Sequence, residues 1–413
     1  MRILLVNTYD QQGGAARATW RLFKGLERAG VDVKLLVQNR GSRDIHVIST
    51  GGKITRYFNA IRPYIDFAFP LPLVRKRILF STSFLPDGIE KIIRKINPDI
   101  IHLNWIAGGM IRIESLARLS KPVVWTFHDL WAFTGGCHYP PDCTRYMEQC
   151  GHCPVLHSTS DRDLSRWVFN RKKEAYNQMG QFFIISPSNW LADCVKSSTL
   201  LKNNPVSVIP NGLDTTVFKP MDKNEVRHLF HLPADKKLIL FGGIRGVEYE
   251  LKGFSLLLEA LRLLDPSAFE LVVFGSSRIK NSTLLPLKTH VLGFIGQENK
   301  LASLYATADV VVVPSYQEVF GQTATEALSC GIPVVAFDST GLKDIIDHQV
   351  NGYLATPYEP AELARGIEWI LDDPERYGKL SENAREKALE KFDIGKITDK
   401  ILTFYPEVLR KRL

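Results

Sequence analysis

The chain has 413 residues and 45% of them are hydrophobic, so it is too long for one ordinary core and long enough for two α/β domains. Its net charge of +8 suits anionic ligands or an anionic membrane surface without requiring nucleic acid. No basic groove interleaved with aromatic residues is apparent, and we expect no nucleic-acid partner. No apolar run approaches the length of a membrane span, and no signal-peptide pattern precedes residues 3–7, so we expect a cytoplasmic protein.

The first half alternates buried-type strands with amphipathic helices, which is typical of a doubly wound domain. Strands are predicted at residues 3–7, 33–38, 99–103, 123–127 and 182–186, and helices at 15–29, 89–96, 110–119 and 188–197. The segment 206–220 is predicted to contain a strand and a polar turn, which indicates the crossover to a second domain. We therefore expect a first domain at residues 1–204.

A second α/β set follows the crossover and predicts a domain at residues 205–393. Its expected strands are 237–241, 269–274, 290–292, 309–314 and 334–337, and its expected helices are 254–264, 297–306, 324–330, 360–371 and 374–392. The last stretch, 394–413, is amphipathic and is expected to pack on one of the two domains.

The segment 53–85 fits this α/β pattern worst, because it mixes aromatic and aliphatic residues with Lys and Arg. One interpretation is a segment that lies on a membrane, with apolar side chains among the headgroups and basic ones near anionic lipid. The other is a long excursion that packs against its own domain and forms part of a cleft wall. The sequence leaves both open.

The most informative segment follows the predicted strand 309–314, where Glu318 and Glu326 stand eight residues apart around a helix start. Backbone N–H groups at Gly321, Gln322 and Thr323 would favour a diphosphate, by hydrogen bonding and by the helix dipole. A carboxylate at Glu326, one turn further in, suits a vicinal diol such as a ribose. For the glutamate pair alone, the alternative is two solvated residues of a first helical turn.

Other candidate groups follow strands in both halves. Gly13 and Gly14 come after the first strand and would let backbone amides approach a phosphate, although a simple tight turn also explains them. His128, beside Asp129, directly follows a strand and has a catalytic and a structural interpretation. Arg245 and Lys252 share a glycine-rich loop beyond strand 237–241, where two cations would neutralise a leaving diphosphate. The alternative for that loop is a solvated surface.

Four of the six cysteines cluster within one short segment. Cys137, Cys143, Cys150 and Cys153 have spacings that approach those of a structural zinc site, with His138 and His152 as reserve ligands. Four uncoordinated cysteines are the alternative, since disulfides are disfavoured in a reducing cytoplasm. Both interpretations remain open.

These motifs occur in an order that resembles the retaining glycosyltransferases of the GT-B fold, in the large family of bacterial exopolysaccharide, mannosyl and sucrose-phosphate-type enzymes. The resemblance spans nearly the whole chain and is strongest from residue 314 to residue 367. It rests on Gly13-Gly14, His128-Asp129, Asn211-Gly212-Leu213-Asp214, Gly242-Gly243 with Arg245 and Lys252-Gly253, and the pair Glu318 and Glu326.

The resemblance implies two Rossmann-like domains that face each other across a cleft, an N-terminal acceptor domain and a C-terminal donor domain. It also implies that the helix 394–413 returns to the N-terminal domain. Retention would proceed by front-face attack, with the leaving phosphate taking the acceptor proton. Neither a dedicated base nor a catalytic metal is then needed.

Site roles follow from the resemblance, position by position. Arg245 and Lys252 match the pair that binds the donor diphosphate, Glu318 the glutamate beside the transferred sugar, and Glu326 the one that holds the ribose. His128 matches the histidine facing the sugar, and Gly14 the glycine near the phosphate. The backbone around Phe320, Gly321 and Gln322 would meet sugar hydroxyls and phosphate. The loop between Arg245 and Lys252 is longer than in the family, which leaves its path open.

We therefore predict a glycosyltransferase that uses a UDP- or GDP-linked sugar and a saccharide acceptor in surface polysaccharide synthesis. The segment 53–85 adds a lipid-linked acceptor and a location at the inner face of the plasma membrane as one alternative. A nucleotide-sugar-binding subunit without turnover is the rival from another class, and a nucleotide-sugar epimerase is a weaker rival.

Overall fold

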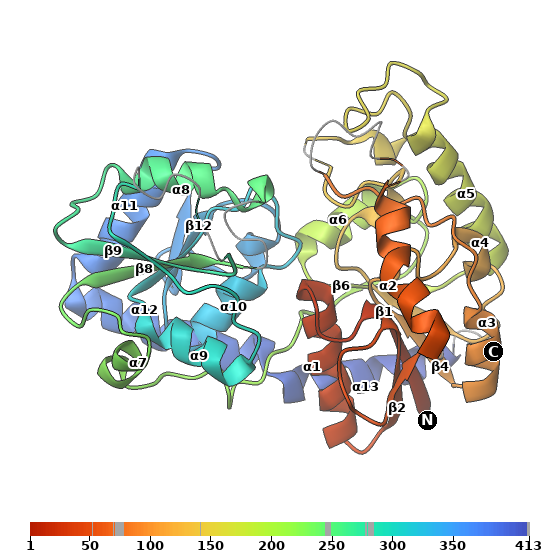
Figure 1. Ribbon diagram of the computed structural model, residues 1–413, viewed down its shortest axis with the longest axis horizontal. Coiled ribbons are helices and arrows are strands. Elements are labelled where there is room, and N and C mark those ends of the chain that lie inside the picture. The colour runs from red at the N-terminus through yellow and green to blue at the C-terminus, as the bar shows by residue number, and fades with distance from the viewer. Residues whose placement is uncertain are drawn as a thin grey trace. The chain divides into compact units, whose positions relative to one another are not determined.

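The computed structural model divides the chain into two compact units, Met1–Ile209 with Thr398–Leu413, and Pro210–Ile397 (Figure 1). It describes residues 1–51, 53–68, 70, 78–140, 142–243, 249–276, 279 and 285–410, and only the backbone of 53–56. Each unit is built around its own parallel sheet.

A seven-stranded sheet in the order β3-β2-β1-β4-β5-β6-β7 forms the centre of the first unit. The chain starts in the middle of this sheet, where Leu5 pairs with Leu35 on one side and with His102 on the other. The strands are β1 (Arg2–Tyr9), β2 (Asp32–Asn39), β3 (Val47–Ser49), β4 (Ile100–Leu103), β5 (Val123–Thr126), β6 (Phe183–Ser186) and β7 (Val206–Val208). Because the strand order reverses between β1 and β4, their carboxyl ends mark the switch point at which such sheets bind ligands.

Helices connect the strands of this first unit. They are α1 (Gly14–Arg28), α2 (Lys53–Ala68), α3 (Ile89–Ile96), α4 (Ile113–Leu116), α5 (Leu164–Met179) and α6 (Asn189–Ser197), with 3-10 turns at Trp131–Phe133 and Arg145–Met147. The predicted helix at 110–119 is only the single turn α4, because Arg112 before it is extended and the bonds after it, from the Arg118 and Leu119 N–H groups to Ser115 O and Leu116 O, are of the 3-10 type.

The last helix, α13 (Ile394–Arg410), belongs to the first unit from Thr398 onward. Its buried Tyr405 hydroxyl lies 2.7 Å from His102 Nδ1, and Thr126 Oγ1 lies 2.7 Å from the other ring nitrogen of His102. Burial lowers the pKa of His102 to about 3, so this imidazole is neutral near pH 7. A hydrogen-bonded neutral histidine thus joins β4, β5 and the end of the chain.

A six-stranded parallel sheet in the order β10-β9-β8-β11-β12-β13 forms the second unit. Its strands are β8 (Lys237–Gly242), β9 (Phe269–Phe274), β10 (Thr289–Val291), β11 (Val310–Val313), β12 (Val334–Phe337) and β13 (Gly352–Ala355). Its helices are α7 (Lys223–Leu229), α8 (Phe254–Leu261), α9 (Glu298–Thr307), α10 (Gln322–Ser329), α11 (Pro360–Leu371) and α12 (Pro374–Lys387), with 3-10 turns at Glu250–Lys252 and Thr340–Asp344 and a π turn at Ala388–Phe392.

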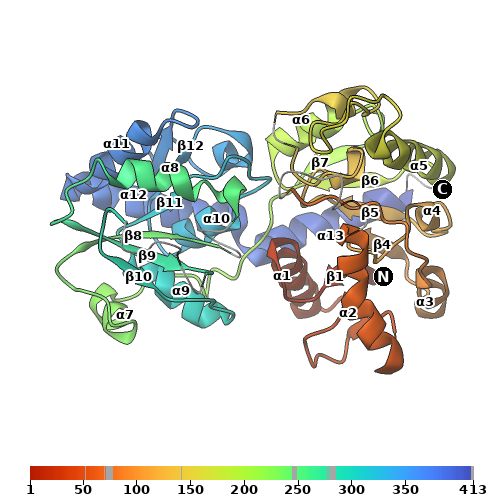
Figure 2. The same cartoon turned by 45° about the horizontal axis from the view of Figure 1, so that its top comes forward.

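Two hydrophobic cores cover the two faces of this second sheet. One packs the strands against α9, α10 and α12, and the other packs them against α8 and α11 (Figure 1; Figure 2 gives a turned view). Val311 and Val313 enter the first core and Val310 and Val312 the second, so the apolar run of β11 is buried on both faces. Burial on both faces explains why this strand lacks a polar alternation.

Five elements lie where the sequence predicted none, namely α2, α5, α7, β3 and β13. The strands β3 and β13 are short edge strands, too brief for a periodic signal. The start of α5 is set by Asp163, whose carboxylate caps Ser165 and Arg166. Its buried face includes Lys172, a charged residue that hides the apolar pattern of the helix. The predicted helix at 324–330 begins two residues earlier, at Gln322.

Candidate functional site

The loop between β11 and α10 carries the most informative segment of the sequence. It ends at Gly321, the N-cap residue of α10, whose φ of 94° lies in the left-handed region. A Cβ at Gly321 would lie 2.8 Å from Leu342 Cδ2, so the backbone and the packing both call for glycine. No side chain caps this helix start. The positive end of α10 therefore faces the loop that holds Glu318.

Glu318 and Lys252, both predicted as site residues, form an ion pair. Lys252 Nζ lies 2.5 Å from Glu318 Oε1, and their side chains are 24% and 14% exposed. The Ser315 hydroxyl donates to the same carboxylate oxygen at 2.9 Å. The carboxylate thus holds a lysine ammonium at the start of α10, a pairing that the sequence did not predict.

The backbone of Glu318 is fixed by the loop after β12. Its N–H donates to Thr340 Oγ1 at 3.1 Å, and its carbonyl accepts from the Gly341 N–H at 2.8 Å. A Cβ at Gly341 would lie 2.2 Å from Val319 O, so only glycine allows this close approach. Sequence reasoning missed Ser315, Thr340 and Gly341, because nothing in their spacing marks them.

Lys252 reaches this position because its 3-10 turn, Glu250–Lys252, is tied to the end of β11. The Tyr316 N–H donates to Leu251 O at 2.9 Å. Gly253, which follows with a φ of 67°, lies so close that a Cβ there would be 1.8 Å from Pro314 O. The contact between these two segments therefore sets the distance between Lys252 and Glu318.

We expect Gly253→Ala to displace the turn that carries Lys252 and to lower the free energy of unfolding of the second unit by about 2–4 kcal/mol, because it adds left-handed strain to a backbone clash. Thermal or urea unfolding measures this. Gly378→Ala is the matched control, since its Cβ meets nothing within 4 Å and it lies within α12. That change is expected to be neutral or to stabilise by about 0.5–1 kcal/mol. Equal stability of the two variants would contradict this account.

Glu326 is buried inside the same unit, with 3% of its surface exposed. The Tyr305 hydroxyl, from α9, lies 2.9 Å from Glu326 Oε2 and holds the carboxylate in place. Tyr305 is also fully buried. The sequence did not predict its role as a partner of Glu326, because a tyrosine in a helix usually indicates core packing. The pair is a preorganised acceptor group one turn into α10.

Glycines line the carboxyl edge of the neighbouring strands β8 and β9. A Cβ at Gly275 would lie 1.9 Å from Gly243 O, and the Gly275 N–H donates to Gly293 O at 2.7 Å. The loop ends therefore approach each other at backbone distance. The predicted cation Arg245 lies outside the described residues.

In the first unit, the predicted glycines Gly13 and Gly14 stand at the start of α1. Gly13 is the N-cap with a φ of 99°, and no side-chain hydrogen bond caps the helix. The loop before it is fixed by Asp10, whose carboxylate accepts from the N–H groups of Gly41 and Ser42 at 2.7 to 3.0 Å. The arrangement brings the ends of β1 and β2 together beneath this helix start.

His128 follows β5, as predicted, and its Nε2 lies 3.1 Å from Asn104 Oδ1. Asn104 uses its amide nitrogen to donate to His102 O, so its oxygen accepts and His128 Nε2 carries the proton. Burial lowers the pKa of His128 to about 4, and adjacent Asp129 offsets this only in part. His128 is therefore a neutral imidazole whose Nδ1 is an acceptor. Asn104 was not predicted.

The four cysteines do not form a ligand set in the structure. All are free thiols, and no three of their sulfur atoms lie within 4.8 Å of one another in the described chain. Tetrahedral zinc needs sulfurs about 3.8 Å apart. The reserve ligands are engaged elsewhere, His138 with Asp129 Oδ2 at 2.6 Å and His152 with Thr159 O at 2.7 Å. The structure thus does not support the zinc interpretation of Cys137, Cys143, Cys150 and Cys153.

Lys172 holds the same segment from within. Its buried ammonium donates to Trp131 O and, at 3.0 Å, to Thr134 O, and it lies 3.9 Å from the centre of the Trp131 ring. Burial lowers the pKa of Lys172 to about 7. Lys172 thus satisfies two backbone carbonyls of the turn that precedes the cysteine segment.

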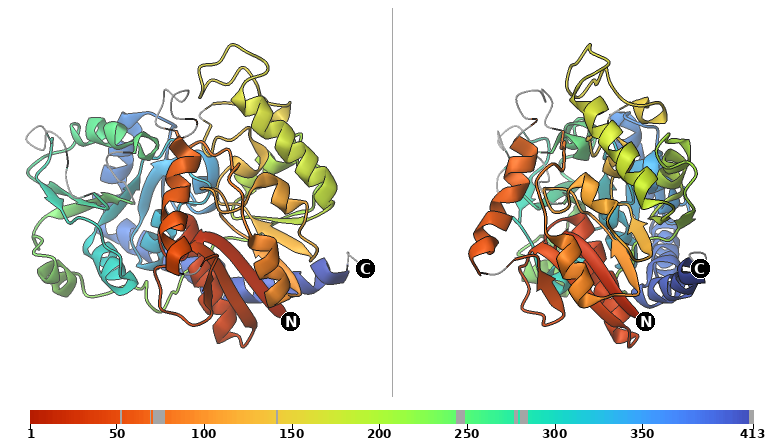
Figure 3. Two further views of the ribbon diagram at one scale, coloured as in Figure 1. Left: turned by 45° about the vertical axis from the view of Figure 1, so that its right-hand side comes forward. Right: turned by 90° about the vertical axis from the view of Figure 1, so that its right-hand side faces the viewer.

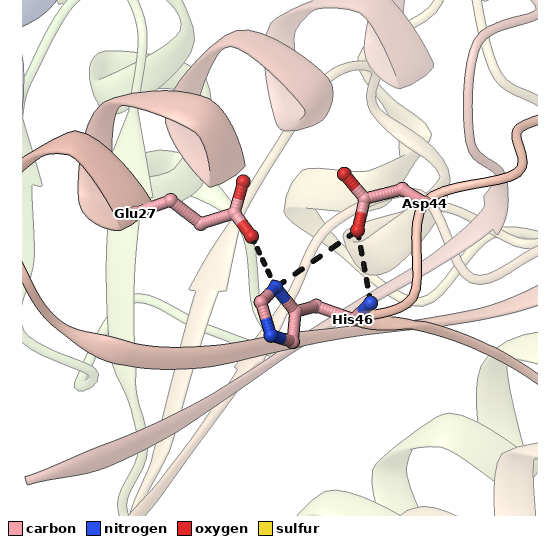
Figure 4. A group of neighbouring side chains, drawn as sticks. All are labelled: Glu27, Asp44 and His46. Carbon is pink, nitrogen blue, oxygen red and sulfur yellow. Dashed lines mark hydrogen bonds and ion pairs between the residues drawn. The ribbon is translucent and has the colours of Figure 1, made fainter.

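One cluster among the described residues brings three metal-ligating side chains close together, but an ion pair explains it (Figure 4). His46 Nδ1 lies 2.6 Å from Glu27 Oε1 and 3.9 Å from Asp44 Oδ1. Lys24 pairs with both carboxylates, with Glu27 at 2.7 Å. Lysine thus already supplies the positive charge that a cation would bring.

Two family models match consecutive parts of the chain. "Glycosyltransferase Family 4" matches residues 12–217, and "Glycosyl transferases group 1" matches residues 222–387. A D-inositol 3-phosphate glycosyltransferase of Catenulispora acidiphila is 32% identical over 328 residues, covering 74% of this chain and 72% of that protein. The chain belongs to the group 1, family 4 glycosyltransferases. It is therefore a glycosyltransferase that depends on a nucleotide sugar, and the predicted enzyme class is confirmed.

Other relatives of this glycosyltransferase show how far the similarity extends. An uncharacterized glycosyltransferase of Methanocaldococcus jannaschii is 28% identical over 385 residues, or 89% of this chain and 90% of that protein. Sucrose-phosphate synthase of Thermosynechococcus elongatus has the same fold, with a TM-score of 0.72 at 21% identity and full coverage of both chains. HepE of Anabaena, solved with UDP-glucose, has a TM-score of 0.67 at 19% identity over 98% of this chain and 100% of that chain. The GT-B fold predicted from the sequence is confirmed.

Proposed function

We propose that this glycosyltransferase moves a sugar, with retention, from a nucleoside diphosphate sugar to a hydroxyl of a saccharide acceptor. The single observation that carries the proposal is the ion pair between Lys252 and Glu318 beside the uncapped start of α10. A cation and a helix N-terminus suit a diphosphate, and a carboxylate suits the positive charge that develops on the sugar. The sequence resemblance supports the same assignment.

The donor is assigned to the second unit. Lys252, Arg245 and the backbone of Phe320, Gly321 and Gln322 are proposed to bind the diphosphate and sugar hydroxyls. Glu326, oriented by Tyr305 at 2.9 Å, is proposed to accept hydrogen bonds from the ribose. UDP or GDP is the proposed carrier, and the UDP-glucose complex of HepE, a protein of the same fold, supports the UDP alternative.

Transfer is proposed to occur on one face of the sugar. The bond between the anomeric carbon and the leaving phosphate oxygen breaks, the acceptor oxygen bonds to the same face, and its proton passes to the leaving phosphate. Lys252 neutralises the phosphate as this charge develops, and Glu318 stabilises the positive charge on the sugar ring. Neutral His128 is proposed to accept a hydrogen bond from a sugar hydroxyl through Nδ1.

The acceptor is assigned to the first unit. Gly13 and Gly14 of that unit are proposed to approach a phosphate of the donor. We propose residues 1–204, with the last helix, as the acceptor domain and 205–393 as the donor domain. Surface polysaccharide synthesis is the proposed role, and a lipid-linked saccharide is one alternative for the acceptor. The relatives named D-inositol 3-phosphate glycosyltransferase support a ring hydroxyl as the accepting group.

A panel of UDP-, GDP- and ADP-linked sugars tests this proposal. We expect one carrier to raise the thermal midpoint and to release nucleoside diphosphate slowly by hydrolysis, faster once an acceptor saccharide is added. If a nucleotide sugar binds but no nucleoside diphosphate is released with any acceptor, the result would favour a nucleotide-sugar-binding subunit without turnover. A shift in the sugar's configuration while it stays on the nucleotide would favour the epimerase.

A further inference from the structure

The helix α2 presents an apolar face to solvent. Tyr57 and Tyr64 are 80% and 74% exposed, and Phe58 and Ile61 are each 52% exposed. Tyr57, Ile61 and Tyr64 follow one another at four- and three-residue steps, so they form one stripe along the helix. Ala60 and Ala68 are exposed as well. Figure 3, right, shows this orange-red helix with one long side turned away from the strands of its unit.

The opposite, buried face of α2 is polar. Asn59 Nδ2 donates to Thr50 Oγ1 at 3.0 Å, and Arg62 Nε donates to Gln38 Oε1 at 3.1 Å. Asp66, which is fully buried, accepts from the Ser83 N–H at 2.7 Å and from Thr82 Oγ1 at 3.2 Å. Surface helices of soluble domains show the reverse arrangement, with the apolar stripe inside and polar residues outside.

The hydrogen bonds of the polar face fix this orientation. Arg62 also donates to Gly109 O at 2.8 Å and to Pro86 O at 2.7 Å, so its guanidinium is satisfied only when this face points inward. Turning the aromatic stripe inward would leave Arg62 and Asp66 without these partners, a large cost for buried polar groups. The exposed apolar stripe is therefore a property of the folded unit. Only contact with another apolar surface would remove it from water.

The charge of the surrounding sequence indicates which occupant. Apart from the buried Asp66 and Arg62, residues 53–85 contain no acidic residue and five basic ones, Lys53, Arg56, Arg75, Lys76 and Arg77. A second copy of this chain would bring two such basic segments together, which is unfavourable. An anionic lipid surface is complementary to it. Tyrosines at both ends of an apolar stripe also suit the boundary between headgroups and acyl chains.

We propose that the outward face of α2, formed by Tyr57, Phe58, Ala60, Ile61, Tyr64 and Ala68, docks on a bilayer that contains anionic lipid. The helix lies in the plane of the interface and inserts only these side chains. No helix in the described part of the chain is long and apolar enough to cross a bilayer. Every residue of the docking surface belongs to the first unit, whereas the proposed donor site belongs to the second.

Vesicle binding by the full chain, without any substrate, tests the proposal. We expect cosedimentation with phosphatidylcholine vesicles that contain phosphatidylglycerol, and much weaker binding to phosphatidylcholine alone or at high salt. The triple variant Tyr57→Ser, Ile61→Ser, Tyr64→Ser is expected to bind these vesicles at least about tenfold more weakly than the unsubstituted chain. Its thermal midpoint should match that of the unsubstituted chain, because the three side chains are exposed.

Leu229→Ser with Leu263→Ser is the matched control, since both leucines are about as exposed as Ile61 but lie in the second unit. This variant should bind vesicles as the unsubstituted chain does. Equal binding by the triple variant, or equal binding to neutral vesicles, would overturn the proposal. So would a dimer in solution that the triple variant loses while vesicle binding is absent. Failure here leaves the donor panel unaffected, so the two proposals are tested separately.

Discussion

Lys252→Met is expected to lower kcat/KM for sugar transfer by about 10²–10³, mostly through kcat. Methionine keeps the apolar stem and removes the ammonium, which lies 2.5 Å from Glu318 Oε1. A cation aimed at the leaving diphosphate contributes most when negative charge develops there, in the transition state. Steady-state kinetics with the preferred nucleotide sugar measures the effect.

Lys288→Met is the matched control for this prediction, because Lys288 also pairs with a glutamate of the second unit, Glu270, at 3.2 Å. Its loss should leave kcat unchanged. Lys252→Arg, which keeps the charge, should recover part of the activity. If Lys252→Met is as active as the Lys288→Met control, the diphosphate role assigned to Lys252 is wrong.

Glu318→Gln is expected to lower kcat by about 10² or more, while the affinity for nucleoside diphosphate stays equal or rises. Glutamine keeps the shape of the side chain and can keep the contact with Ser315 Oγ, which lies 2.9 Å from the Glu318 carboxylate. It removes the negative charge that stabilises a positive sugar ring. It also releases Lys252 from its ion pair, so that the ammonium can bind phosphate alone. Steady-state kinetics measures kcat, and titration with nucleoside diphosphate measures the affinity.

The split between kcat and affinity separates a catalytic role from a structural one, since a misfolded site would lose both. Glu362→Gln serves as the control, because Glu362 pairs with Arg365 on the surface of α11, at 3.3 Å. An unchanged kcat in Glu318→Gln would remove Glu318 from the reaction. It would also revive the interpretation of this residue as a solvated helix-start glutamate.

Strands buried on both faces were the easiest elements to predict. The runs at β11 and β12, VVVV and VVAF, are continuous and apolar, so local sequence defines them. The helix α2 was missed because its polar and apolar faces are inverted relative to an ordinary surface helix. Its pattern becomes interpretable only once Arg62 and Asp66 are seen inside.

The members of the candidate site were easier to predict than their contacts. Glu318, Lys252, Glu326 and His128 each follow a strand or open a helix, which is a local signal. Their partners Tyr305 and Asn104 come from other elements, and the pairing of His102 with Tyr405 spans 303 residues. Such contacts depend on which elements the topology brings together, which spacing along the chain does not encode.

For the cysteine cluster, the zinc interpretation remains a prediction that the structure does not support. The spacing of the cluster approaches that of a zinc site, yet the reserve ligand His138 bonds to Asp129 and Ser81. Lys172, far away in sequence, already satisfies the carbonyls of the preceding turn. The spacing of the cysteines therefore could not show that the two histidines, His138 and His152, have other hydrogen-bond partners.

The most direct test of the central claim, a diphosphate site at Lys252 and the start of α10, is calorimetric titration of the full chain with UDP, UMP, GDP and GMP. We predict that one diphosphate binds at least about tenfold more tightly than its monophosphate, because the second phosphate meets the cation and the helix start. The same difference should become smaller in Lys252→Met, in which only the helix start remains. Equal affinity for monophosphate and diphosphate in the unsubstituted chain would contradict the account.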